Sequence, residues 1–213
     1  TFSFANYYNP ERMRFGLLRV LNDDTVAGGE GFGTHPHENM EIISMPLKGN
    51  LEHKDSMGNK IIINPGEVQL MSAGMGVKHS EYNHLPSEEV QFLQIWVCPK
   101  EKDIPTRYDQ RLFSVEERKN QLRTVVSPSK EDDALWINQD AYFSIGELDT
   151  GIALTYNIKK SGNGVYAFII EGSVEMAGET LKKRDGIGIS ETESVDIKAT
   201  SPSFGLLMEV PMN

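Results

Sequence analysis

Short apolar runs rich in Val, Ile, Phe and Tyr alternate along the whole chain with Gly, Pro, Asn and Asp. Many such runs, repeating roughly every 8–12 residues, predict an all-β sandwich or barrel. One helix is expected at 114–121, where Ser114 and Glu117 have the spacing of a capping box. Strands are expected at 15–21, 41–47, 61–63, 67–71, 90–97, 122–126, 134–138, 142–148, 152–158, 164–170 and 205–210.

The two halves of the chain resemble each other. In each half a strand ends at a Gly turn, a second Gly turn begins another strand, and an apolar strand closes the unit. The three segments are 47–52, 65–70 and 92–97 in the first half, and 170–175, 185–189 and 205–210 in the second. This order predicts a duplicated barrel. We expect a domain at 1–122, which includes a connector from residue 99 onwards, and a domain at 123–213, packed face to face.

Composition limits the class of protein. The 213 residues carry 21 Lys and Arg against 31 Asp and Glu, a net charge of −10, which disfavours direct binding to nucleic acid. No apolar run approaches the roughly 20 residues of a membrane helix. One cysteine and no signal-type start favour a cytoplasmic protein. The chain lacks an initiator Met, so a leading piece is expected to be missing.

All five histidines lie between His35 and His84, and the second half has none. His35-Pro36-His37 and His79-Ser80-Glu81 each place two metal-ligating groups two residues apart, and such residues share one face of a strand. If the two strands meet across a barrel interior, three imidazoles and a carboxylate converge. That set suits a divalent transition metal and leaves coordination positions open for a substrate.

Four other reactive residues have plainer interpretations. Glu41 has the parity of His35, so it faces inward only if the strand is unbroken. His53 is expected to be a solvated strand or turn residue, and His84 to lie on the surface before a Pro-containing loop. Cys98 ends an apolar strand and is expected to be a buried, inert thiol.

The histidine segments resemble the two motifs of cupins. The first motif is 31–37 with Glu41 and Gly49, and the second is Gly66, 74–76, His79 and Asn83, with Gly74 where Pro is usual. The closest resemblance is to the pirin branch of bicupins, through 1–4, 18–24, 35–37 and 72–81. Residues 55–60 and 108–111 are similar to the bacterial pirin-like proteins credited with quercetin 2,3-dioxygenase activity.

This resemblance implies an all-β bicupin with one metal site, in the N-terminal barrel. Ordinary cupins take their carboxylate ligand from the first motif and pirins from the second, so the implied ligands are His35, His37, His79 and Glu81. Glu41 would then orient an imidazole. The implied cofactor is one divalent transition metal, iron first, with copper, nickel, manganese, cobalt or zinc as alternatives.

The resemblance also implies a reaction. Pirin-like quercetinases bind a flavonol through its 3-hydroxyl, cleave the central ring with dioxygen and release carbon monoxide. Glu81 is the expected proton acceptor. The expected partners are a flavonol-like small molecule and dioxygen, with no nucleic acid and no membrane. The alternative is a regulatory or redox-sensing protein that acts through protein partners, as eukaryotic pirins do, or a cupin that binds metal without turnover.

Overall fold

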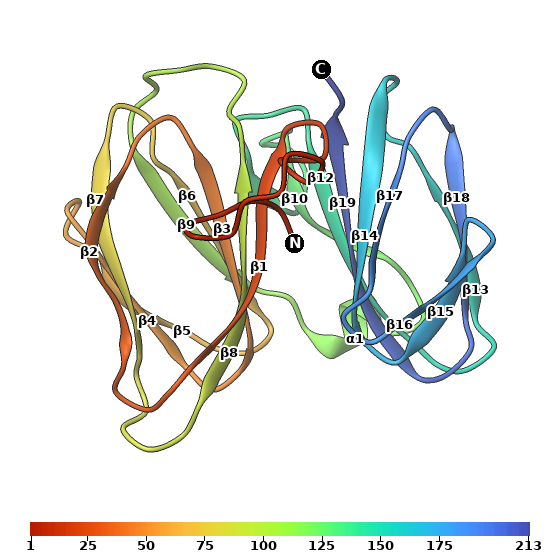
Figure 1. Cartoon of the computed structure of the whole chain (residues 1–213), viewed down its shortest axis with the longest axis horizontal. Coiled ribbons are helices and arrows are strands. Elements are labelled where there is room, and N and C mark those ends of the chain that lie inside the picture. Colours follow the sequence, from red (N-terminus) through yellow and green to blue (C-terminus); the bar gives the residue numbers. More distant parts are fainter. The chain divides into compact units, whose positions relative to one another are not determined.

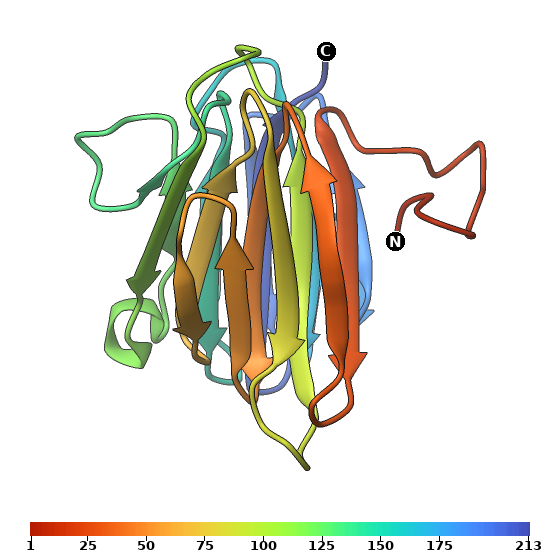
Figure 2. The same ribbon diagram turned by 90° about the vertical axis from the view of Figure 1, so that its left-hand side faces the viewer.

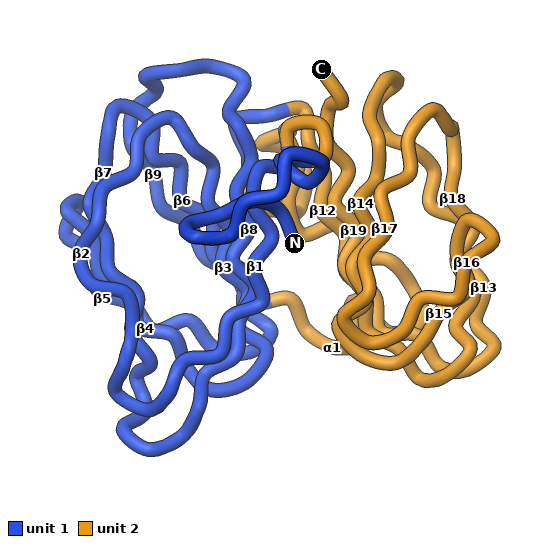
Figure 3. Tube along the Cα trace, in the orientation of Figure 1, with its two compact units in different colours: residues 1–14, 18–112, 137–139 blue, residues 15–17, 113–136, 140–213 orange.

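The computed structural model describes residues 1–213 and consists almost entirely of β-strands (Figure 1). Its one helix, α1 (Val115–Arg118), is too short to cross a membrane. The chain divides into two compact units, coloured separately in Figure 3. Unit 1 comprises Thr1–Arg14, Leu18–Leu112 and Ile137–Gln139, and unit 2 comprises Phe15–Leu17, Phe113–Trp136 and Asp140–Asn213.

Unit 1 consists of two antiparallel sheets, of order β1-β8-β3-β6-β9 and β2-β7-β4-β5. Figure 2 views this unit with the four-stranded sheet towards the reader. The strands are β1 (Leu18–Val26), β2 (Gly31–His37), β3 (Glu41–Lys48), β4 (Leu51–Asp55), β5 (Lys60–Ile63), β6 (Glu67–Ser72), β7 (Val77–Asn83), β8 (Val90–Val97) and β9 (Arg107–Leu112).

The interior of unit 1 has three levels, which are visible along β8. Phe92 belongs to an apolar cluster with Leu51, Ile63 and Val90. Trp96 packs against a second cluster, formed by Ile42, Met71, Ala73 and Val77. Gln94 lies between these two aromatic residues on the same face of the strand, because side chains two residues apart point the same way. The level of Gln94 is polar, and its other buried members are Ser44, His53, Gln69 and Glu81.

Unit 2 has the same two-sheet construction with a different interior. Its sheets have the orders β11-β10-β12-β19-β14-β17 and β13-β18-β15-β16. One apolar cluster runs through it and includes Val165, Ile169, Val174, Ile197 and Leu207. The strands are β10 (Arg123–Ser127), β11 (Leu135–Trp136), β12 (Tyr142–Leu148), β13 (Ala153–Asn157), β14 (Asn163–Glu171), β15 (Ser173–Met176), β16 (Glu179–Lys182), β17 (Gly186–Ile189), β18 (Ser194–Ala199) and β19 (Ser203–Pro211).

The all-β prediction is confirmed, with two corrections of detail. Residues 107–112 do not belong to a connector: they form β9, which pairs with β6 at the edge of the five-stranded sheet. The helix covers only Val115–Arg118, although the expected capping bond is present, since the Ser114 backbone N–H donates to Glu117 Oε2 at 2.7 Å. The domain segments 1–122 and 123–213 stay a proposal.

Candidate metal centre

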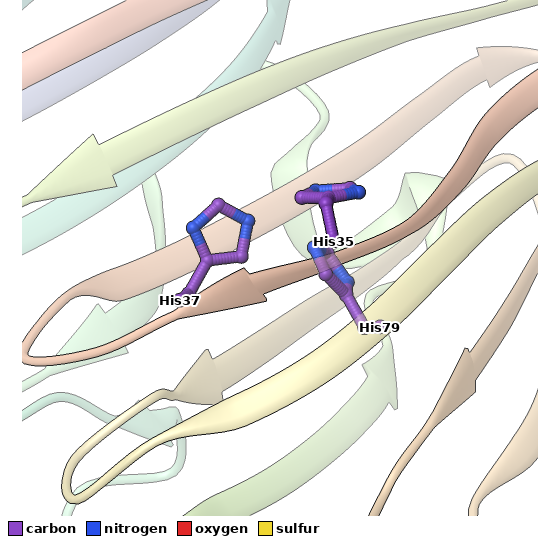
Figure 4. A group of neighbouring side chains, drawn as sticks. All are labelled: His35, His37 and His79. Carbon is purple, nitrogen blue, oxygen red and sulfur yellow. The ribbon is translucent and has the colours of Figure 1, made fainter.

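Three histidines converge inside unit 1 (Figure 4). His35 and His37 come from β2, and His79 from β7, where it lies directly opposite His35. A register shift between Phe32 and His35 marks an irregularity in β2, of the kind that re-aims side chains. The ring centroids are 4.5 Å apart for His35 and His79, 4.8 Å for His35 and His37, and 4.9 Å for His37 and His79.

Each of these rings has a nitrogen atom available to bind a metal ion. His35 Nδ1 lies 2.7 Å from the Gly33 carbonyl oxygen, which can only accept, so Nδ1 carries the proton and Nε2 keeps its lone pair. His37 Nε2 and both ring nitrogens of His79 are buried and have no hydrogen-bond partner. Buried polar atoms without partners cost free energy. A bound cation would remove that cost.

Electrostatics keeps two of the rings neutral. Burial and, to a smaller extent, the charge of His35 lower the pKa of His37 to about 4. Burial, followed by the charges of His35, His37 and His53, lowers the pKa of His79 to about 3. At neutral pH both rings are therefore uncharged, which is the form of imidazole that ligates metals.

Glu81, also on β7, belongs to a second group with His53 and His79, so it adjoins the three histidines through His79. Two donors from the opposite sheet hold its carboxylate. The Ser44 hydroxyl donates to Oε1 at 2.9 Å, and Gln94 Nε2 donates to Oε2 at 2.7 Å. The Trp96 indole N–H donates to Gln94 Oε1 at 3.2 Å. Because an indole can only donate, this bond turns the Gln94 amide so that its NH₂ faces Glu81.

His53 is the residue that the sequence interpretation placed wrongly. It is fully buried rather than solvated, and its ring lies 5.3 Å from that of His79. His53, His79 and Glu81 form a second group whose ligand atoms lie within 4.8 Å of one another. His53 Nε2 donates to Asp55 Oδ2 at 3.0 Å, while its Nδ1 has no partner. The spacing of His53 and Asp55 was the available signal, but only the strand register brings His53 opposite Glu81.

Glu41 does not orient an imidazole. β2 ends at His37, Asn39 has a positive φ of 47°, and β3 begins at Glu41, so the parity argument fails across this break. Glu41 Oε2 accepts bonds from the Ser72 hydroxyl at 2.8 Å and the Asn138 backbone N–H at 3.2 Å. Burial raises the pKa of this carboxyl group.

The two remaining candidates lie outside the group. His84 is on the surface, as expected, with Nδ1 3.2 Å from Glu52 Oε2. Cys98 is half-buried rather than fully buried, and it is not in a disulfide.

The loop before β7 explains why glycine replaces proline in the second motif. Gly74 has a φ of +44°, and a Cβ there would lie 2.0 Å from the Ile104 carbonyl oxygen. That oxygen accepts the Met75 backbone N–H at 3.0 Å, which ties the loop to the segment before β9. Only a residue without a side chain allows this approach. The contact fixes where β7 starts, and therefore where His79 lies.

The donor set fits a divalent transition metal. Three imidazoles with available nitrogens and one carboxylate match the ligands that such ions take from proteins. Both groups of side chains that could hold an ion lie in unit 1.

Comparison with known proteins agrees with this description. The family model described as Pirin matches residues 1–97, and the Quercetinase C-terminal cupin domain model matches 124–210. The chain is 41% identical to the quercetin 2,3-dioxygenase of Escherichia coli K12, over 99% of this chain and 90% of that protein. It is 40% identical to a pirin-like protein of Caulobacter vibrioides, over 98% and 89%.

A solved structure agrees as well. The crystal structure of the bacterial pirin YhhW of Escherichia coli in complex with nickel(II) superposes with a TM-score of 0.93, at 40% identity, over 99% of this chain and 90% of that one. The sequence matches cover nearly the whole chain, and the two-barrel fold agrees with them. The chain belongs to the pirin family of bicupin proteins.

Proposed function

We propose that this protein is a metal-dependent dioxygenase of the pirin-like quercetinase type, which cleaves a flavonol such as quercetin with dioxygen and releases carbon monoxide. One observation carries the proposal: three imidazoles converge, with an oriented carboxylate within 4.8 Å of one of them, in one barrel of a chain 41% identical to a named quercetin 2,3-dioxygenase. The proposed ligands are His35, His37, His79 and Glu81. Iron is our first choice of ion, and the nickel in the related structure supports the divalent charge only.

A bound divalent ion would supply Lewis-acid polarisation of the flavonol 3-hydroxyl and a template for the two reactants. The protein contributes a proton acceptor. Glu81 is suited to take the hydroxyl proton, because Ser44 and Gln94 fix the direction of its carboxylate. Loss of that proton leaves an electron-rich enolate that dioxygen can attack.

The surroundings of His37 combine an apolar wall with an open groove, whose lining also includes the charged residues Glu38 and Lys78. Trp96 lies edge-on to His37, with ring centroids 4.8 Å apart, and packs on the apolar cluster of Ile42, Met71, Ala73 and Val77. A groove of about 610 Å³ beside His37 is lined by residues that include Pro36, Ser56 and Lys78. A space of that size accommodates a molecule as large as a flavonol.

The test is steady-state turnover of quercetin by protein reconstituted in turn with Fe, Cu, Ni, Mn and Co, with carbon monoxide measured as product. His35→Ala should lose activity mainly through lost metal, and excess metal should partly restore it. Metal-loaded Glu81→Gln should stay about 10²–10⁴-fold slow, the usual cost of removing a general base. His84→Ala, which changes an exposed histidine outside the group, is the matched control.

Two outcomes would contradict the proposal. Near-normal turnover by metal-loaded Glu81→Gln would leave Glu81 a ligand and not a base. Absence of turnover by the wild type with every one of these ions would favour the regulatory alternative.

A further inference from the structure

A carboxylate outside the ligand group faces the same interior. On β1, Asn22 lies directly opposite Gln94 and Asp24 directly opposite Phe92. Directly opposed residues in antiparallel strands share a face, so Asp24 points to the same side as the glutamine that holds Glu81. Asp24 lies two residues, or about 7 Å, along β1 from Asn22, which is opposite Gln94 in the polar level of unit 1.

The fold gives this carboxylate little support. Burial raises the pKa of Asp24 to about 6, and the charges of Glu81 and Asp23 act in the same direction. The positive charge of the Thr1 ammonium group acts in the opposite direction, and no hydrogen bond is among the influences on this pKa. Glu81, by contrast, receives two hydrogen bonds. A half-buried acceptor that the protein leaves without a donor costs stability, which is typical of a group kept for a ligand.

Aromatic surface lies beside it. Phe32 on β2 is directly opposite Glu81, so its ring faces the interior. It meets Phe92, the residue opposite Asp24, with ring centroids 6.4 Å apart and the rings nearly perpendicular. Phe32 nevertheless remains 42% exposed. An open aromatic face next to an unpaired acceptor is complementary to a phenol, which has a flat apolar ring and an O–H donor.

We infer that Asp24 and Phe32 form a recognition subsite for a phenolic ring of the substrate, with Asp24 accepting a hydrogen bond from that ring's hydroxyl group. The inference rests on the proposed function and specifies the substrate class. The substrate chelates through one hydroxyl and carries a second, phenolic hydroxyl about one ring away. Among flavonols, the pendant ring of quercetin meets this description, whereas galangin has the same chelating group and a pendant ring without hydroxyls.

The experiment compares quercetin with galangin in three variants at equal metal content. Asp24→Leu should lower kcat/KM for quercetin about tenfold or more, mainly through KM, and leave galangin within about twofold, since a hydrogen bond to a charged group is lost for one substrate only. Asp24→Asn, which keeps one acceptor oxygen, should fall between. Asp23→Asn, the exposed neighbour on the opposite face of β1, should change neither.

A second readout does not require turnover. Binding of both flavonols to metal-loaded protein, followed by absorbance without dioxygen, should show the wild-type preference for quercetin and its loss in Asp24→Leu. In the metal-free protein, Asp24→Asn should melt at the wild-type temperature or above it, because burial and the charges of Glu81 and Asp23 disfavour the ionised carboxylate more than the Thr1 ammonium group favours it. A residue with a purely structural role would instead lower the melting temperature.

Equal losses for quercetin and galangin, or a lower melting temperature with no change in preference, would overturn the assignment of Asp24. These outcomes are separable from failure of the proposed function. If the wild type turns over neither flavonol, the reaction is wrong, and the binding preference still decides whether Asp24 recognises a phenol.

Discussion

Gln94 offers a sharp test of how the centre is held together. It is 7% exposed, and its amide donates to Glu81 Oε2 at 2.7 Å while accepting from Trp96 Nε1. Gln94→Met keeps the length and approximate volume of the side chain but removes both bonds. A buried hydrogen bond to a charged group is worth about 1.5–3 kcal/mol. Part of that energy should appear as metal affinity, because Gln94 holds the proposed ligand Glu81 in one direction before an ion binds.

We therefore expect Gln94→Met to bind metal roughly ten- to a hundredfold more weakly, the usual range for partners that orient metal ligands. The assay is competition between the apo protein and a chelator of known affinity for Ni²⁺ or Co²⁺. Ser44→Ala removes the other donor to Glu81 and should give a smaller loss, and the double variant should lose less than the sum if the two donors act through one carboxylate.

The matched control is Gln69→Met. Gln69 is another buried glutamine of the same polar level, on β6 opposite Ser44, and neither its Oε1 nor its Nε2 has a hydrogen-bond partner. Replacing it should leave metal affinity nearly unchanged and should not destabilise the fold. If Gln94→Met folds normally and binds metal within twofold of wild type, Gln94 does not hold the centre in the way described here.

Two further predictions concern stability. Glu209→Gln should lower the free energy of unfolding by about 2–3 kcal/mol in a denaturant melt and leave metal affinity unchanged, because Glu209 is buried in unit 2 and accepts bonds from Tyr156, Asn163 and two backbone N–H groups. Gly74→Ala should lower both the melting temperature and the metal affinity, since its Cβ would lie 2.0 Å from a backbone oxygen at a φ of +44°. Gly205→Ala, in unit 2 and with its nearest atom at 3.7 Å, is the control, and equal behaviour of the two variants would contradict the role given to Gly74.

Strands with apolar residues on both faces could be predicted from the sequence almost to the residue. The expected strands at 90–97 and 142–148 coincide with β8 and β12. β4 was missed as a strand, because His53 and Asp55 occupy interior positions that alternation expects to be apolar, and of β7 only 79–81 was expected to be extended, through its ligand-type pair. Polar residues of the site therefore interrupt the apolar alternation by which their own strands would be predicted.

The ligand-type residues divide in the same way. His35, His37 and His79 could be grouped from the sequence with two assumptions. Residues two apart on a strand share a face, and the strand of His35 and His37 pairs with the strand of His79. His53 could not be assigned to this group from the sequence, because its approach to His79 depends on the register of a third strand, β4, against β7. Glu41 failed for a local reason: Asn39 adopts a positive φ between two strands, and sequence parity does not survive such a turn.

The two units share a fold but differ in how their buried polar side chains are satisfied. In unit 2 the interior is apolar, and its buried carboxylate, Glu209, is satisfied by four donors. In unit 1 the unpartnered buried atoms include His37 Nε2 and both nitrogens of His79. A cation bound to these imidazole nitrogens would supply the interaction that internal hydrogen bonds do not. We therefore expect the stability of unit 1 to rise with metal concentration. The buried carboxylate of unit 2 finds its donors within the fold, whereas unit 1 keeps imidazole nitrogens without partners, and this difference distinguishes the two barrels.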